Sequence, residues 1–340
     1  MASSINDINV DEMFFDANYI EINPTHLSNH FKINNDQLSI LNINIQSLTK
    51  NFNMLLSLLN LSKIHYTIIV VSETWLKDSD DSLFNITGYN HISLNRRGPI
   101  SGGGLRIYYS QSIAFIKIND ALTGEFSSHE CLACELSVQN KYKLKIIGIY
   151  RPPKNNMKNF IDHLKSKKVA HNTKNPNDIK IIAGDMNIDY KNNFNMPRTH
   201  QKYFDLFTSN AFKFHITKPT RLGSKGQSSS IIDHIWSNCF SETFSFTMNY
   251  KISDHIPNAV IFDRKIKVAP LKKTFFDFRL KNVINFIRNK HLSFDPLIKY
   301  KINEINEATD YIYKQIMKML AFYFPIQTKQ LTRKRLKERD

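Results

Sequence analysis

Cysteine is scarce in this chain, which carries only Cys131, Cys134 and Cys239 among its 340 residues. So small and odd a number excludes a disulfide framework and is typical of proteins from a reducing compartment. Cys131 and Cys134 form a single CxxC pair, without a second pair or suitably spaced histidines. A zinc site is therefore disfavoured, and we expect both thiols to pack as small side chains within a strand.

Long apolar runs and several familiar motifs are also missing. No stretch approaches the roughly 20 apolar residues that a membrane-spanning helix needs. The N-terminus lacks the basic and apolar regions of a secretory signal, so we expect an intracellular protein that is neither secreted nor inserted in a membrane. The absence of GxGxxG, Walker A, HExxH and GxSxG motifs argues against dinucleotide binding, P-loop chemistry, HExxH proteolysis and acyl transfer by a serine nucleophile.

Acidic residues are outnumbered by basic ones. The chain has 46 Lys and Arg against 30 Asp and Glu, a formal net charge of +16. This surplus favours a polyanionic partner, most often nucleic acid, over the alternative of a merely soluble basic protein. With 41% hydrophobic and 12% aromatic residues, the chain has a globular composition and can bury a substantial core.

The chain divides into three regions by composition. Residues 1–36 are polar and locally acidic without sustained periodicity, so we expect mostly disorder with at most a short helix. Residues 37–263 alternate short apolar runs with helical segments, and we expect the folded body there. From Arg264 the strand signals stop, and apolar residues between Ile302 and Met319 mark one face of a long helix. We therefore expect a helical, basic extension over 264–340.

Within the body, short apolar runs bounded by turn residues predict strands. They occur at 38–44, 66–71, 113–118, 131–138, 143–150, 179–183, 231–236, 244–250 and 258–262, and a further strand is expected directly after the glycines 102–104. Apolar residues at helical spacing predict helices around 52–61, 160–164 and 203–207.

Several of these strands end in polar side chains. The apolar run 179–183 passes through Gly184 into Asp185 and Asn187, and the run 66–71 leads into Glu73. One such ending is an ordinary turn, but repeated endings of this kind favour a site at one edge of a sheet. The side chains concerned are Asn42, Asn44, Glu73, Tyr150, Arg151, Asp185, Asn187, Thr220, Asp233, Ser253, Asp254 and His255.

This collection of carboxylates, amides, one tyrosine and one histidine suits a phosphoesterase that uses a hard metal ion. Mg²⁺ binds oxygen ligands and keeps several waters, so a carboxylate such as Glu73 can anchor it. Asp185 is the candidate to orient or deprotonate an attacking water. Asp233 beside His255 would fix the tautomer of the imidazole and favour its cationic form, which can neutralise charge on a phosphodiester.

Five motifs in this order, SETWL, GIYRPP, IIAGDMN, IDHI and SDH, resemble those of the endonuclease/exonuclease/phosphatase superfamily. The longer series from LNIN to SDHIP more closely resembles the apurinic-type endonuclease domain of non-LTR (LINE-type) retrotransposons, from Leu38 to about Phe262. The resemblance implies an α/β (α+β) fold of two packed mixed β-sheets flanked by helices. Such a fold is a four-layer αββα sandwich like that of deoxyribonuclease I, with the site at one edge.

The resemblance also implies roles for individual residues. The implied catalytic residues are Asn42, Tyr150, Asp185, Asn187, Asp233 and His255; the implied metal-shell residues are Glu73, Asn44 and Asp254; and the implied substrate contacts are Arg151, Thr220, Arg221 and Ser253. Abasic-site repair enzymes carry an aspartate where this chain has Asn44. That difference favours a transposon-type nickase over a repair enzyme and leaves Glu73 as the main metal anchor.

The implied function is a Mg²⁺-dependent endonuclease, with Mn²⁺ as the alternative ion and no organic cofactor. It would nick double-stranded DNA in the nucleus to prime reverse transcription. Region 264–340 resembles the linker to a reverse transcriptase, whose motifs are absent, so we expect a partial product of such an element. Two alternatives remain open: a small-molecule phosphoesterase acting on an inositol phosphate or phospholipid head group, and a DNA-binding remnant without catalytic activity.

Overall fold

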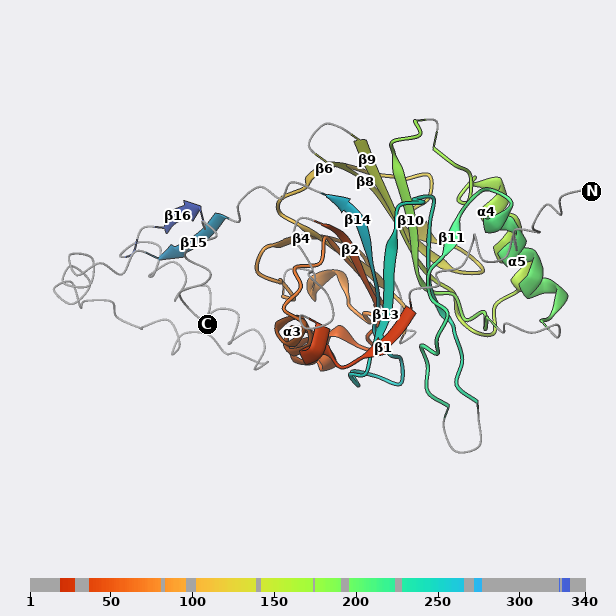
Figure 1. The fold of residues 1–340 in the computed structure, drawn as a ribbon, viewed down its shortest axis with the longest axis horizontal. Coiled ribbons are helices and arrows are strands. Elements are labelled where there is room, and N and C mark those ends of the chain that lie inside the picture. The colour runs from red at the N-terminus through yellow and green to blue at the C-terminus, as the bar shows by residue number, and fades with distance from the viewer. Residues whose placement is uncertain are drawn as a thin grey trace, which may run out of the picture. The chain divides into compact units, whose positions relative to one another are not determined.

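The computed structural model divides the chain into two compact units, Met1–Val268 and Ala269–Asp340. The described residues are 19–27, 37–80, 83–95, 102–138, 142–173, 175–190, 196–223, 228–265, 272–276, 324 and 326–330. The first unit carries two seven-stranded β-sheets with helices outside them (Figure 1).

The first sheet is mixed and has seven strands. Their order is β1 (Tyr19–Ile22), β13 (Thr243–Met248), β14 (Asn258–Lys265), β2 (Gln37–Asn44), β3 (Ile68–Ser72), β5 (Leu105–Ser110) and β4 (Tyr89–Leu94). β2 and β3 run parallel, and both are buried on both faces, as expected for central strands with continuous apolar sequence. Asn44 pairs with Ser72 at the end of this parallel pair, so β2 and β3 deliver their following residues to the same edge.

The second sheet is also mixed and lies face to face with the first. Its order is β11 (Lys213–Phe214), β12 (Asp233–Ser237), β10 (Ile179–Asp185), β9 (Tyr142–Tyr150), β8 (Glu130–Val138) and β6 (Ala114–Ile118), with β7 (Gly124–Glu125) paired to β8. β10 runs parallel to β9 and antiparallel to β12. The two registers place Tyr150 and Asp233 directly beside Asp185, one on each side.

Helices cover the outer face of each sheet. α3 (Leu48–Ser62) begins at Ser47, whose side chain accepts from the Lys50 amide, and packs Leu55 and Leu58 against the first sheet. α4 (Met157–Ser166) and α5 (Arg198–Thr208) lie outside the second sheet (Figure 1). Two short 3-10 helices, η1 (Pro24–His26) and η2 (Asp78–Asp80), complete the described helical segments.

This arrangement confirms the expected fold of two packed mixed sheets flanked by helices. Apolar side chains of β2, β3 and β5 alternate between an inner core shared with the second sheet and an outer core shared with α3. Cys131 and Cys134 are free and buried in β8, as expected for packing residues. None of the helices in the described ranges is long and apolar enough to cross a membrane.

The prediction of disorder near the N-terminus is wrong for residues 19–27. Tyr19–Ile22 forms β1, which pairs in parallel with β13 at the edge of the first sheet. Ile22 and Leu27 are buried in the outer core. This tertiary contact stabilises a segment whose few apolar residues do not predict a strand. Residues 1–18 and 28–36 lie outside the described residues.

The C-terminal region also departs from expectation. β15 (Lys272–Phe276) and β16 (Ile326–Gln330) form an antiparallel pair in the second unit, although no strand was expected after Arg264. The strands are fifty residues apart in sequence, and neither carries a distinctive local pattern of its own. The helix expected between Ile302 and Met319 lies outside the described residues.

Candidate active site

Polar side chains gather where β2, β3, β9 and β10 end, between the two sheets. Asp185 is the last residue of β10, and its side chain is 1% exposed. Its Oδ1 accepts from the Asn187 amide at 2.9 Å, and its Oδ2 accepts from Asn44 Nδ2 at 2.9 Å and from Asn187 Nδ2 at 3.2 Å. A carboxylate held by three donors is fixed in position before any ligand arrives.

The pKa of Asp185 is raised. Burial is the main cause because it disfavours the charged form, and the neighbouring Asp233 adds to it. His255, Asn187 and Asn44 act in the opposite direction without cancelling the effect. A carboxyl group of this kind is a better proton acceptor than an exposed aspartate once it is ionised.

His255 and Asp233 form a buried ion pair beside Asp185. His255 Nδ1 donates to Asp233 Oδ2 at 2.8 Å, and His255 Nε2 lies 4.0 Å from Asp185 Oδ2. Burial opposes the imidazolium charge, but the contribution of Asp233 outweighs it and raises the pKa of His255 to about 9. The imidazole is therefore cationic at neutral pH, with its Nε2 proton directed toward the centre of the site.

Glu73 follows β3 in a left-handed backbone conformation, with φ of 53°. Its Oε1 accepts from Asn44 Nδ2 at 2.8 Å, and its Oε2 accepts from Trp75 Nε1 at 3.2 Å. The Tyr150 hydroxyl is also hydrogen-bonded to Glu73, and burial, together with the nearby carboxylates, raises the pKa of Tyr150. Glu73 and Asp185 thus share the Asn44 amide.

Asn44, which we expected in the metal shell, contacts both of these carboxylates. Its Nδ2 donates to both carboxylates, and its Oδ1 accepts from the Gln46 amide at 3.2 Å. An amide nitrogen cannot coordinate a cation, so in this arrangement Asn44 positions the two acidic side chains. Asn42 lies two residues earlier on the same strand face, fully buried, and its Nδ2 donates to Asn258 Oδ1 at 3.4 Å.

Asp254 lies at the rim of the site with a 40% exposed side chain. Arg221 Nε contacts its Oδ2 at 2.9 Å, Gln46 donates to its Oδ1, and His255 Nε2 lies 3.9 Å from that oxygen. Partial burial opposes its ionisation, but His255, Arg221 and Gln46 together lower the pKa of Asp254. Asp254 is thus anionic and oriented toward the histidine.

Three residues expected to contact substrate instead hold the loops of the site. Arg151 is 4% exposed and donates to the carbonyls of Met186, Asn155 and Asn187, each at 2.7 Å. Thr220 is fully buried, and its Oγ1 accepts from the amides of residues 232 and 233. Ser253 Oγ donates to the Asn44 carbonyl at 2.7 Å. Their donors and acceptors are used inside the protein, and a direct contact with substrate stays a prediction for these three residues.

Sequence reasoning missed Trp75 and Gln46. Trp75 belongs to the SETWL motif, yet nothing in the sequence indicates that its side chain is 44% exposed while its indole nitrogen holds Glu73. Gln46 bears no motif and reaches Asp254 only because the segment after β2 turns with φ of 45° at that residue. Both assignments need the tertiary structure.

The oxygen donors of the site suit a hard divalent cation better than a transition metal. Asp185, Asp233 and His255 place one potential ligand atom each within 4.8 Å of one another. Asp233 raises the pKa of His255, which disfavours the neutral imidazole that metal binding needs. Glu73 and Asp254 are the better candidates, since carboxylate oxygens suit Mg²⁺ or Mn²⁺.

Comparison with known proteins places this geometry in context. The model of the Endonuclease/Exonuclease/phosphatase family matches residues 41–255. The endonuclease domain of TRAS1, a telomere-specific non-LTR retrotransposon, has 11% sequence identity and a TM-score of 0.52, covering 67% of this chain and 99% of that domain. The AP endonuclease LMAP from Leishmania major has 13% identity and a TM-score of 0.54, covering 68% of this chain and 90% of its own. No curated protein matches the chain.

Proposed function

This chain belongs to the endonuclease/exonuclease/phosphatase family, and on that premise we propose that it is a divalent-metal-dependent endonuclease that nicks double-stranded DNA. The observation that carries the proposal is the convergence of Glu73, Asp185 and the His255–Asp233 pair at one edge of the sandwich. These groups match the needs of phosphodiester hydrolysis: a proton acceptor, a cationic donor and a metal anchor.

Asp185 is the proposed general base. It is held by Asn44 and Asn187, and its raised pKa favours uptake of a proton from a water molecule. His255 is the proposed electrostatic partner, because its cationic Nε2 can donate to a phosphoryl oxygen as negative charge develops. Asn187 Nδ2 already donates to Asp185 and to the Arg151 carbonyl, so we assign it the positioning of Asp185.

Glu73 is the proposed main metal anchor, with Asp254 as a second carboxylate at the rim. A bound Mg²⁺, or Mn²⁺ in its place, would supply neutralisation of the charge on the phosphodiester. Tyr150 reaches Glu73 through its hydroxyl and is proposed to contact the phosphate from that side. Asn42 lies deeper and is proposed to act only by supporting this edge of β2.

DNA is the proposed substrate because of charge and exposure at the rim. The chain has a formal net charge of +16, and Arg221 is 44% exposed beside Asp254. The exposed indole of Trp75 offers a stacking surface for a base next to Glu73. The fold shared with the retrotransposon endonuclease domain supports a role in target-site nicking in the nucleus, with region 264–340 as a link to a reverse transcriptase.

Supercoiled plasmid provides the test of this function. We expect conversion to open circles with Mg²⁺ and none with EDTA, because the metal neutralises the scissile phosphate. If the protein hydrolyses inositol phosphates or phospholipid head groups but leaves the plasmid uncut, the substrate class is a small phosphoester and not DNA. Salt-sensitive DNA binding without any hydrolysis would show a remnant that only binds.

The pH dependence of nicking tests the roles of His255 and Asp185. The folded pKa of His255 is above its ordinary value of 6.5, so the imidazolium is present at neutral pH and is lost as pH rises through about 9. The pKa of Asp185 is also raised, so its base form is lost as pH falls. We expect a bell-shaped profile of kcat/KM, and the stability that the His255 pair contributes should decline from pH 6.5 to about 9.

Asp233→Asn is the diagnostic variant for this profile. It removes the largest cause that raises the His255 pKa, so the alkaline limb should move to lower pH. The acid limb should move in the same direction, because Asp233 also contributes to the raised pKa of Asp185. Asp205→Asn, an exposed change on α5, is the matched control and should leave both limbs in place. An alkaline limb that stays in place in Asp233→Asn would assign the titration to another group.

Asn44→Asp tests the metal anchor without relying on activity. The change removes the amide that donates to Glu73 and Asp185 and adds a third carboxylate, so we expect a loss of about 1–3 kcal/mol in stability without metal. Mg²⁺ should restore much of this loss, because it compensates the added charge and gains an oxygen ligand. Thermal unfolding with and without Mg²⁺ measures both effects. Asn249→Asp, at an exposed position, is the control, and an equal Mg²⁺ response in both variants would contradict the assignment.

A further inference from the structure

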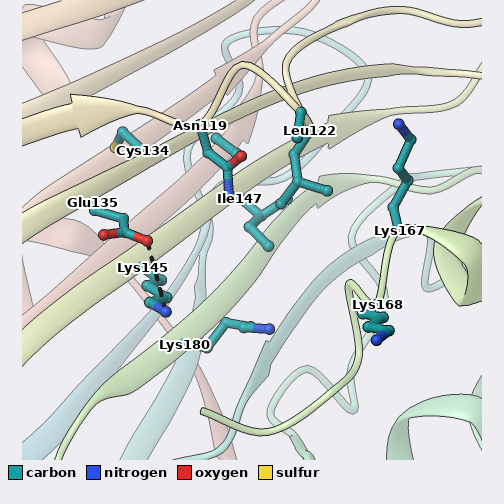
Figure 2. Close-up of a pocket in the computed structure, with 11 residues that line it drawn as sticks. Asn119, Leu122, Cys134, Glu135, Lys145, Ile147, Lys167, Lys168 and Lys180 are labelled. Atoms are coloured by element: carbon teal, nitrogen blue, oxygen red, sulfur yellow. Dashed lines mark ion pairs between the residues drawn. The ribbon is translucent and has the colours of Figure 1, made fainter. Parts of the chain in front are cut away.

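A basic region lies on the outer face of the second sheet. It is a cavity of about 190 Å³ with walls from β8, β9, β10, the loop before β7 and the end of α4 (Figure 2). Lys180 is the second residue of β10 and Asp185 its last, so the cavity lies toward the opposite end of the strand from the candidate active site. Its lining includes four lysines, Lys145, Lys167, Lys168 and Lys180, and one acidic residue, Glu135.

Lys145 and Lys180 are the unusual members of this set. They are register partners on the parallel strands β9 and β10, so two like charges stand side by side on one sheet face. Such a cross-strand pair is destabilising without a compensating charge. Lys145 has a partial one, since its Nζ lies 3.6 Å from Glu135 Oε1.

Lys180 is more constrained than its neighbour. It is 9% exposed, and its Nζ donates to the carbonyls of Val169 at 3.2 Å and His171 at 2.6 Å. Burial, with a smaller contribution from Lys145, lowers the pKa of Lys180 to about 8. Within the described part of the chain no ion pair neutralises Lys180, so an anion in the cavity would stabilise its charged form.

Lys167 and Lys168 complete the basic wall from the other side. Both are exposed and follow directly after α4, where basic residues commonly complement the negative end of a helix. That explanation does not extend to Lys145 and Lys180, which lie on strands. Figure 2 shows Lys145 and Lys180 on the strands, Lys167 and Lys168 on the segment to their right, and Asn119 and Leu122 above the two strand lysines.

We propose that this cavity is a second binding site, separate from the catalytic centre, for a small ligand that bears two or more phosphate groups. The lining carries a formal charge of +3, and a concave surface with a net positive charge concentrates an anionic ligand. The apolar side chains of Leu122, Ala133 and Ile147 reduce competition by water. The volume is below the roughly 300 Å³ of ordinary drug-sized sites, which favours a compact polyphosphate over a duplex backbone.

Isothermal titration with inorganic pyrophosphate, without metal and at constant ionic strength, tests this site. The charge-reversal pair Lys167→Glu and Lys168→Glu should weaken binding by about tenfold or more, because two cations of the wall become anions. The matched control is Lys158→Glu with Lys165→Glu, two exposed lysines of α4 that do not line the cavity. The control should bind like the unchanged protein, since the bulk charge changes equally in both pairs.

Three results would overturn the proposal. The first is no heat of binding with millimolar pyrophosphate, and the second is equal weakening in the two charge-reversal pairs, which would indicate a general charge effect. The third is retention of binding in Lys167→Glu/Lys168→Glu, which would place the ligand elsewhere, including at the catalytic centre. A parallel titration with a short single-stranded oligonucleotide distinguishes the sources of phosphate, because a strand that binds only at the catalytic centre should bind both charge-reversal pairs equally.

Discussion

Asp185→Asn is expected to slow DNA nicking by about 10²–10⁴-fold, the range that general acid–base catalysis contributes. The substitution keeps the size and shape of the side chain but removes the proton acceptor at the centre of the site. In the unchanged protein, Asn44 Nδ2 and Asn187 Nδ2 both donate to Asp185 Oδ2. The loss should appear in kcat rather than in DNA affinity, since Asp185 is buried at the end of β10 and is 1% exposed.

The same variant should not lose stability, and this separates catalysis from folding. The pKa of Asp185 is raised by burial, so ionising this carboxyl group at neutral pH opposes folding. Asparagine carries no charge, which removes this cost, but it turns one of the two acceptor oxygens into an amide nitrogen that faces a donor. We therefore expect the two effects to offset each other and the melting temperature without metal to stay close to that of the unchanged protein. Asp162→Asn, at an exposed position on α4, is the control for both measurements. Nicking by Asp185→Asn at the unchanged rate would remove Asp185 as the base.

Gly184→Ala is expected to give the largest loss of stability, about 2–6 kcal/mol, since overpacking and a strained φ each cost about 1–3 kcal/mol. Gly184 has φ of 142°, and an added Cβ would lie 1.9 Å from the Ile149 carbonyl oxygen. This oxygen belongs to the backbone of the paired strand β9, so no side-chain rotation can relieve the clash. Urea unfolding measures the effect directly.

Gly148→Ala is the matched control for the glycine prediction. Gly148 lies on the partner strand β9, and an added Cβ there would approach Val70 Cγ1 at 3.4 Å, within ordinary packing distance. We expect this control to retain most of its stability. A Gly184→Ala variant as stable as Gly148→Ala would show that β9 and β10 can separate locally. If Gly184→Ala folds, it should still nick DNA poorly, because Asp185 is the next residue and would be displaced.

The sequence by itself determined the main layout of this protein. Alternating or continuous apolar runs such as LSILNIN and IKIIA specify strands, because burial of one or both strand faces dominates their energetics. The polar residues that follow these runs could be recognised because the end of a strand is fixed by its hydrophobic pattern. Glu73 and Asp185 were found in this way, whereas Asp233 lies within an expected strand and His255 shortly before one. The structure brings all four to one edge.

The tertiary structure decided how each polar group is used. Arg151 and Thr220 have the same residue types as substrate contacts, yet their hydrogen bonds are made inside the protein. Asn44 supplies a donor to two carboxylates where its type alone allowed an oxygen ligand. Lys145 and Lys180 become neighbours only through strand register. Hydrophobic periodicity is local and readable along the chain, whereas the direction of a hydrogen bond depends on groups that folding brings from distant positions.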